Sequence, residues 1–200
     1  MESVSLPAPP ATVASPAVNS SADQEFVERA RAGELGAFDE LVRRHQRPLF
    51  GYVYRMCGNR ADAEELVQQA LIRAWQGLAG FRGQSSFKTW LYRIATNLCI
   101  NRVTRRKPLV EIPEELPAPQ SDEPAAVHRQ RVVDEVVQHA LDQLPKDQRA
   151  ALVMVTYDDM SYQEVAHALG KTAKAVDSLL VRARRNLRKL LEPAREKGKI

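Results

Sequence analysis

Apolar residues recur every three or four positions through most of the chain, which is the spacing of a buried face on an α-helix. In the first half, this spacing predicts helices over residues 22–31, 37–57, 62–75 and 87–105. In the second half, it predicts helices over residues 125–144, 147–157, 162–169 and 173–191. The predicted fold class is therefore all-α.

Prolines and hydroxyl side chains indicate where these helices begin or break. Pro48 predicts a break or kink, because proline cannot donate a hydrogen bond inside a helix. Ser85 or Ser86 can cap the helix that follows by accepting a bond from its first-turn amides. Residues 161–164 read Ser-Tyr-Gln-Glu, which is a capping box. Thr172 can cap the last helix in the same way as the serines.

Charge and proline divide the chain into segments, although the net charge is only +4. Residues 108–127 contain five acids, five prolines and no Lys or Arg, which predicts a flexible, extended linker. This linker is either a passive tether or an acidic mimic of nucleic acid. On either side we predict a small helical domain that faces a polyanion, over 23–107 and 128–192. Residues 1–22 are predicted to be a disordered tail, and 193–200 a basic tail.

Two helices of the first domain have a polar face besides the apolar one. On helix 62–75 this face is a mixed polar and apolar stripe, and both a solvated surface and a partner surface fit it; it contains Glu65, Gln68, Gln69 and Ile72. On helix 87–105 the second face carries Arg93, Asn97, Asn101 and Arg105. Amide side chains can hydrogen-bond to base edges and guanidinium groups can hold phosphates, so this face favours nucleic acid.

The second domain ends in a short helix, a turn at Gly170 and a long basic helix. This order is typical of a helix-turn-helix DNA-binding unit. The outer face of the long helix carries Lys174, Ser178, Arg182, Arg185 and Lys189. An αα-hairpin with a solvated arginine face is the alternative.

Other chemistry has little support in the sequence. Cys57 and Cys99 form no CxxC pair and are too few for a zinc site made by protein alone. There is no glycine-rich phosphate loop and no cluster of metal ligands, so we expect no enzyme, no metal and no cofactor. The chain has no run of 18 apolar residues and no signal peptide, so we expect no membrane insertion and a reducing, cytoplasmic location.

Three segments resemble one known family, the extracytoplasmic-function (ECF) sigma factors of bacterial RNA polymerase. Residues 62–75, DAEELVQQALIRAW, are similar to region 2.2 of that family. Residues 81–97, FRGQSSFKTWLYRIATN, resemble regions 2.3–2.4, and residues 161–184 resemble region 4.2. The resemblance covers about residues 23–107 and 128–192. It departs from the family at Glu65 and Gln69, and also at Asp177 and Leu179 in the last helix.

The resemblance implies an alternative sigma factor that binds core polymerase and recognises and melts promoter DNA. It implies binding to the β′ clamp coiled coil and the β subunit, with core-binding residues Asp62, Glu65, Leu66, Gln68, Gln69, Ile72 and Trp75. For the −10 element it implies Arg82, Ser85, Ser86, Phe87, Arg93, Asn97, Asn101 and Arg105. For the −35 element it implies Lys171, Thr172, Lys174, Asp177, Ser178, Val181, Arg182 and Arg185.

The resemblance also implies an inhibitory partner, an anti-sigma factor, and a location at the bacterial nucleoid or at a membrane that holds the anti-sigma factor. The alternative function is a helix-turn-helix transcriptional regulator that acts without core polymerase. The two functions differ in whether the isolated chain binds DNA.

Overall fold

The structure is a computed structural model that describes residues 17–105 and 125–196. The described residues form only helices and the loops between them, which confirms the all-α prediction. The elements are α1 (Ala17–Arg31), α2 (Leu35–Cys57), α3 (Arg60–Gly77), the 3-10 turn η1 (Leu78–Gly80), α4 (Phe87–Arg105), α5 (Ala125–Asp142), α6 (Lys146–Tyr157), α7 (Tyr162–Leu169) and α8 (Ala173–Glu196).

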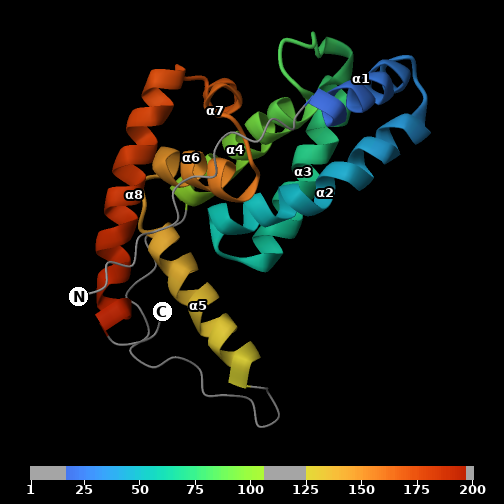
Figure 1. The fold of residues 1–200 in the computed structure, drawn as a ribbon. Coiled ribbons are helices and arrows are strands. Elements are labelled where there is room, and N and C mark those ends of the chain that lie inside the picture. Colours follow the sequence, from blue (N-terminus) through green and yellow to red (C-terminus); the bar gives the residue numbers. More distant parts are fainter. Residues whose placement is uncertain (1–16, 106–124, 197–200) are drawn as a thin grey trace.

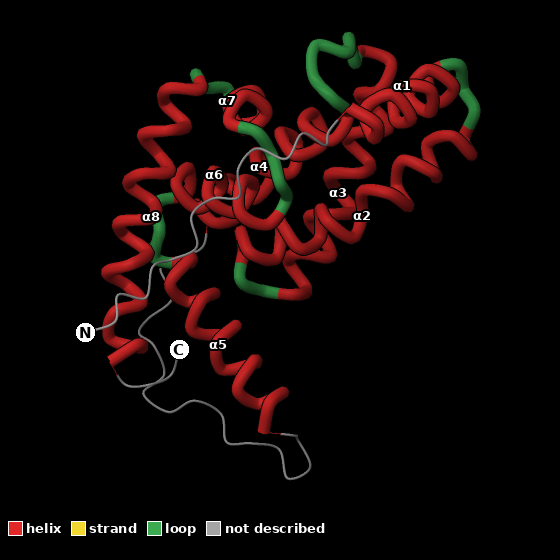
Figure 2. The backbone as a smooth tube through the Cα atoms, viewed as in Figure 1, coloured by secondary structure: helices red, strands yellow, loops and turns green. Residues whose placement is uncertain are grey.

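The helices form two groups that pack against each other. Helices α1–α4 make the first domain and α5–α8 the second. Figure 1 shows α8 along one side of the molecule and α1–α3 on the other, with α4, α6 and α7 between them. Figure 2 shows the short loops that connect successive helices within each group. Helix α4 packs on α2, α3 and α7, and the buried apolar side chains of both domains form one continuous cluster.

Helix α2 is continuous, so the predicted break at Pro48 is wrong. Pro48 itself is exposed, while its neighbours Leu49, Tyr52 and Val53 are fully buried. Proline removes one backbone hydrogen bond on the solvent side, and the burial of the apolar face holds the helix together across it. The helix ends at Gly58, whose φ of 68° is a left-handed conformation that favours glycine.

The predicted helix caps are confirmed. The side chain of Ser86, one of the two candidates, accepts a hydrogen bond from the backbone of Thr89 at 3.2 Å. The capping box of Ser161 and Glu164 is complete in both directions. Thr172 accepts a hydrogen bond from the first turn of α8 at 3.2 Å. These caps satisfy amides that the helices themselves leave without a partner.

Two helices extend beyond their predicted ranges. Helix α1 begins at Ala17, within the segment predicted to be disordered. Helix α5 begins at Ala125, as the helix prediction has it, and α8 continues through Pro193 to Glu196, into the predicted tail. The predictions for residues 1–16, 106–124 and 197–200 lie outside the described residues.

Candidate polymerase and nucleic-acid interfaces

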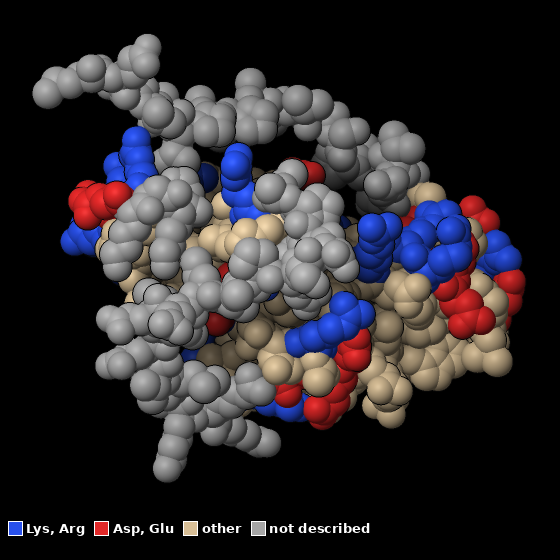
Figure 3. Space-filling model, turned by 90° about the horizontal axis from the view of Figure 1, so that it is seen from below, with Lys and Arg blue, Asp and Glu red and all other residues tan. Residues whose placement is uncertain are grey.

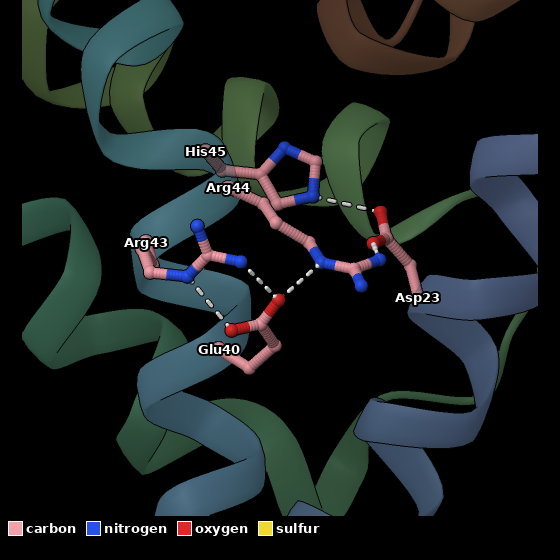
Figure 4. Close-up of polar contacts among 5 residues, drawn as sticks. All are labelled: Asp23, Glu40, Arg43, Arg44 and His45. Atoms are coloured by element: carbon pink, nitrogen blue, oxygen red, sulfur yellow. Dashed lines mark hydrogen bonds and ion pairs between the residues drawn. The ribbon is translucent and has the colours of Figure 1, made fainter.

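A polar cluster around the buried carboxylate of Asp23 ties α1 to α2 (Figure 4). Asp23 of α1 is only 6% exposed, and its carboxylate contacts His45 Nε2 at 2.7 Å and Arg44 Nη1 at 3.3 Å. Arg44 also donates to Glu40 at 2.9 Å, so its guanidinium lies between two acids. Hydrogen bonds from the neighbouring arginines lower the pKa of Glu40 to about 2. Helix α1 is therefore held in place by charged contacts as well as by apolar packing.

The loop over residues 81–86 borders a cavity of about 450 Å³ at the start of α4. Phe87 anchors this loop to the domain core, because its ring packs on the rings of His45 and Phe81. The distances between ring centroids are 5.4 Å to His45 and 6.5 Å to Phe81. The opposite wall of the cavity is α1, which the sequence did not indicate. The cavity is lined by Gln24, Val27, Glu28, Arg31, Phe81, Arg82, Gly83, Ser85, Ser86 and Phe87.

The structure thus brings four of the predicted −10 residues together around one cavity. Arg82 is exposed, and Ser85 and Ser86 are half-buried. Phe87 is 3% exposed and reaches the surface only where it lines the cavity. Its position on the apolar face of α4 makes it a support for the loop.

The rest of the predicted −10 set follows α4 away from the cavity. Arg93, Asn97 and Asn101 are exposed and stand on successive turns of the same face. The side chain of Arg105 lies outside the described residues. An exposed row of one guanidinium and two amides, leading from a cavity, is an arrangement that can hold a nucleic-acid strand.

The predicted core-binding stripe on α3 is mostly accessible. Ile72 is 49% exposed and Trp75 is 38% exposed, with the Trp75 ring packed on Phe38 at 5.0 Å. Gln68 is exposed, and half-buried Gln69 donates to Glu65 at 2.8 Å. Leu66 is only 2% exposed and belongs to the core, so its assignment as a contact residue is corrected.

Two acids of this stripe are paired within the domain. Arg102 of α4 donates to Asp62 at 2.9 Å and contacts Glu65 at 2.7 Å. Hydrogen bonding to Glu65 raises the pKa of Arg102. One guanidinium therefore joins the helix predicted to bind polymerase to the helix predicted to bind the −10 element. No pattern in the sequence indicated this pairing across two helices.

The predicted −35 residues line the start and outer face of α8. They are all exposed: Lys171, Thr172, Lys174, Asp177, Ser178, Val181, Arg182 and Arg185. Thr172 is occupied as a helix cap, and Lys171 forms an ion pair with Asp147 at 2.9 Å. Val181 is 60% exposed and is accessible to a partner on this face.

Basic and acidic side chains lie beside one another on the face shown in Figure 3. Several of the exposed arginines on α1 and α2 are paired with nearby acids, including Arg29 with Glu34 at 2.5 Å. Arg182 and Arg185 have no acidic partner in the described part of the chain. Arginines without an acidic partner are the ones best able to neutralise phosphate.

A contact surface between the two domains was missed by the sequence interpretation. Tyr92 of α4 donates to the Asp158 carboxylate at 2.7 Å. Arg149 of α6 donates to the carbonyl of Met56 at 2.8 Å, at the end of α2. Tyr92 is fully buried by this contact, and helical periodicity carries no information about which distant residue covers a side chain. None of the described helices is both long enough and apolar enough to cross a membrane.

In the described residues, a helix-turn-helix in one helical domain and an Asn/Arg-bearing helix in the other form the arrangement of a two-domain transcription factor. The sequence matches "Sigma-70 region 2" over residues 41–108 and "Sigma-70, region 4" over residues 134–187. The chain belongs to the ECF sigma factors of the sigma-70 family, which are transcription initiation factors.

Two relatives and one solved structure illustrate this membership. The chain is 33% identical to the RNA polymerase sigma-H factor of Pseudomonas aeruginosa, over 86% of this chain and 94% of that protein. It is 36% identical to the ECF RNA polymerase sigma factor SigM of Mycobacterium tuberculosis, over 84% of each. The structure is similar to CnrH in complex with the cytosolic domain of CnrY, with a TM-score of 0.69 and 26% identity over 86% of this chain and 98% of CnrH.

Proposed function

We propose that this chain binds core RNA polymerase through the exposed face of α3 and recognises a promoter with two separate surfaces. The −10 element is recognised by α4 and the cavity before it. The −35 element is recognised by α8. The observation that carries the proposal is the cavity of about 450 Å³ at the start of α4, followed further along the same helix by exposed Arg93, Asn97 and Asn101.

Promoter melting requires a base to leave the stack, which costs a few kcal/mol. The cavity offers a site that can offset this cost, because it combines aromatic walls with polar groups. Phe81 supplies an apolar surface, while Ser85 and Gln24 supply hydrogen-bond donors and acceptors for a base edge. Arg93 and Asn97 then hold the strand that continues along α4. No bond is made or broken, so the work is done by binding energy alone.

Helix α8 fits the role of a recognition helix in the major groove. Lys174, Arg182 and Arg185 are exposed on it and can contact phosphates. Ser178 and Asp177 lie among them and can contact base edges; an aspartate there accepts a hydrogen bond from cytosine N4. An acid on this face disfavours phosphate, so Asp177 selects a base rather than adding affinity.

Core polymerase is the proposed partner of α3, through the β′ clamp coiled coil, with the β subunit as a second contact. Ile72 and Trp75 form an exposed apolar centre, and Gln68 and Glu65 form a polar rim. That is the general composition of a protein interface. By likeness to CnrH, which is bound to the cytosolic domain of CnrY, we also propose an anti-sigma partner for this chain.

The test is transcription from genomic fragments by core polymerase with and without the full chain, using three variants that separate the surfaces. Ile72→Asp should abolish binding to core polymerase. Asn97→Ala should leave core binding intact and impair promoter opening. Arg182→Ala should weaken promoter binding without affecting core binding. Operator binding by the isolated chain, with no effect of core polymerase, would instead establish a helix-turn-helix regulator.

A further inference from the structure

The two domains meet at Asp158, which lies in the turn between α6 and α7. One carboxylate oxygen, Oδ1, accepts a hydrogen bond from Tyr92 Oη of α4 at 2.7 Å. The other oxygen, Oδ2, is buried and has no hydrogen-bond partner among the described residues. Lys88 of α4 donates to the backbone carbonyl of Asp158. Thus a carboxylate of one domain is held against a helix of the other with half of its hydrogen-bonding capacity unused.

This closed arrangement is incompatible with reading both promoter elements at once. Helix α7 packs on both α4 and α8, which limits the separation of those two helices to at most roughly 20 Å at 8–10 Å per packed pair. Promoter positions −10 and −35 are about 25 base pairs apart, or roughly 85 Å of B-form DNA. The chain between residues 105 and 125 can span roughly 70 Å when extended, and the lengths of α4 and α8 themselves cover the remainder, so the two recognition surfaces can separate far enough. The contact at Asp158 must break when they do.

We propose that Asp158 is a proton-dependent latch between the two domains: its neutral form favours the closed arrangement, and its ionised form favours release of the second domain. A buried carboxylate without full hydrogen bonding costs less when it is neutral, whereas an exposed one in the separated domains is ionised freely. The relevance of separation to transcription rests on the proposed function, but the latch itself does not.

The charged and titratable groups around Asp158 support this assignment. Burial raises the pKa of Asp158 to about 6, against the opposing effects of Tyr92 and Lys88 of α4 and Arg55 of α2, and Asp159 beside it raises the pKa further. In the separated domains an exposed aspartate has a pKa of about 3.9. The closed form therefore binds the proton more tightly, and closure strengthens as the pH falls through about 6. Between pH 7.5 and pH 5 the closed-to-open ratio should rise roughly tenfold.

The experiment measures domain separation in the full-length chain by single-molecule energy transfer. Dyes are attached at exposed positions 79 and 189, one in each domain, through genetically encoded azido residues. We expect the high-transfer population to grow roughly tenfold relative to the low-transfer one between pH 7.5 and pH 5. Asp158→Asn, which has the shape of the neutral acid, should be closed at both pH values. Asp159→Asn is the matched control and should keep most of the pH response.

A second variant tests the chemistry of the latch rather than its packing. Tyr92→Phe removes the hydrogen bond that stabilises the ionised carboxylate, so the midpoint of the pH response should move to higher pH. A tenfold response that survives in Asp158→Asn, or no response in the unmodified chain, would overturn the latch. Failure of the unmodified chain to support transcription with core polymerase at pH 7.5 would instead overturn the proposed function, and would leave the energy-transfer result unchanged.

Discussion

Arg149 offers the sharpest test of how the two domains are held together. Its side chain is 5% exposed, and Nη1 donates both to the carbonyl of Met56 and to the carboxylate of Asp142, each at 2.8 Å. The Met56 carbonyl belongs to the last turn of α2, where helix carbonyls have no partner of their own. Arg149 therefore caps a helix of the first domain from within the second. Burial lowers its pKa, with the Asp142 carboxylate acting in the opposite direction.

The perturbation is Arg149→Met, which keeps the apolar stem and removes the guanidinium. A hydrogen bond from a charged donor to a buried carbonyl contributes about 1.5–3 kcal/mol. The pair with Asp142 contributes about 0.5–1 kcal/mol, because that carboxylate is 42% exposed and solvent screens it. The expected decrease in the free energy of unfolding is therefore about 2–4 kcal/mol.

The assay is urea unfolding of the full chain, followed by circular dichroism and by tryptophan fluorescence. Both tryptophans, Trp75 and Trp90, are in the first domain, so fluorescence reports on that domain. The midpoint should fall by about 1–2 M urea for an m-value of about 2 kcal/mol/M. If the domains undock first, the two signals should separate. Arg188→Met, at an exposed site on α8, is the control and should change stability by less than about 0.5 kcal/mol. A decrease below about 1 kcal/mol in Arg149→Met would refute the capping argument.

Three other predictions concern the surfaces and caps. Ser161→Ala should cost about 1 kcal/mol in urea unfolding because it removes the capping box, whereas Gln163→Ala, on the exposed side of the same turn, should be neutral. Replacing Arg182 and Arg185 with Ala should flatten the salt dependence of promoter binding by roughly 0.9 for each phosphate that is no longer neutralised, measured by anisotropy; an unchanged slope would remove them from the DNA face. Asn97→Ala should slow open-complex formation, detected by permanganate footprinting, with normal core binding, and normal opening would reject its role.

The local features of this fold were predictable because their causes are local. Ser86, Ser161 and Thr172 cap helices as predicted, since a cap depends only on residues within one turn. Pro48 misled the prediction, because its local cost is opposed by burial of Leu49 and Tyr52 against distant helices. The weight of that burial cannot be judged from a periodic pattern alone.

The site was predictable only in part, for the same reason. Exposure of Asn97 and Ile72 follows from their place opposite an apolar stripe. The wall that α1 contributes to the cavity does not, since Gln24 is far from the loop in sequence and its side chain is ordinary for a solvated helix. The pairing of Arg102 with two acids of α3 likewise depends on how the helices cross.

Helix α4 explains how closure and DNA recognition can coexist in one domain. It has three faces: Leu91, Ala95 and Leu98 are buried in the first domain, whereas Lys88 and Tyr92 contact the second domain. The third face carries Arg93, Asn97 and Asn101 and stays exposed in the closed form. Closure therefore leaves the proposed −10 surface open. Closure restricts the distance between α4 and α8, so a latch at Asp158 controls whether the chain can reach both promoter elements at once. A closed chain should bind an isolated −10 strand with the same affinity as an open chain.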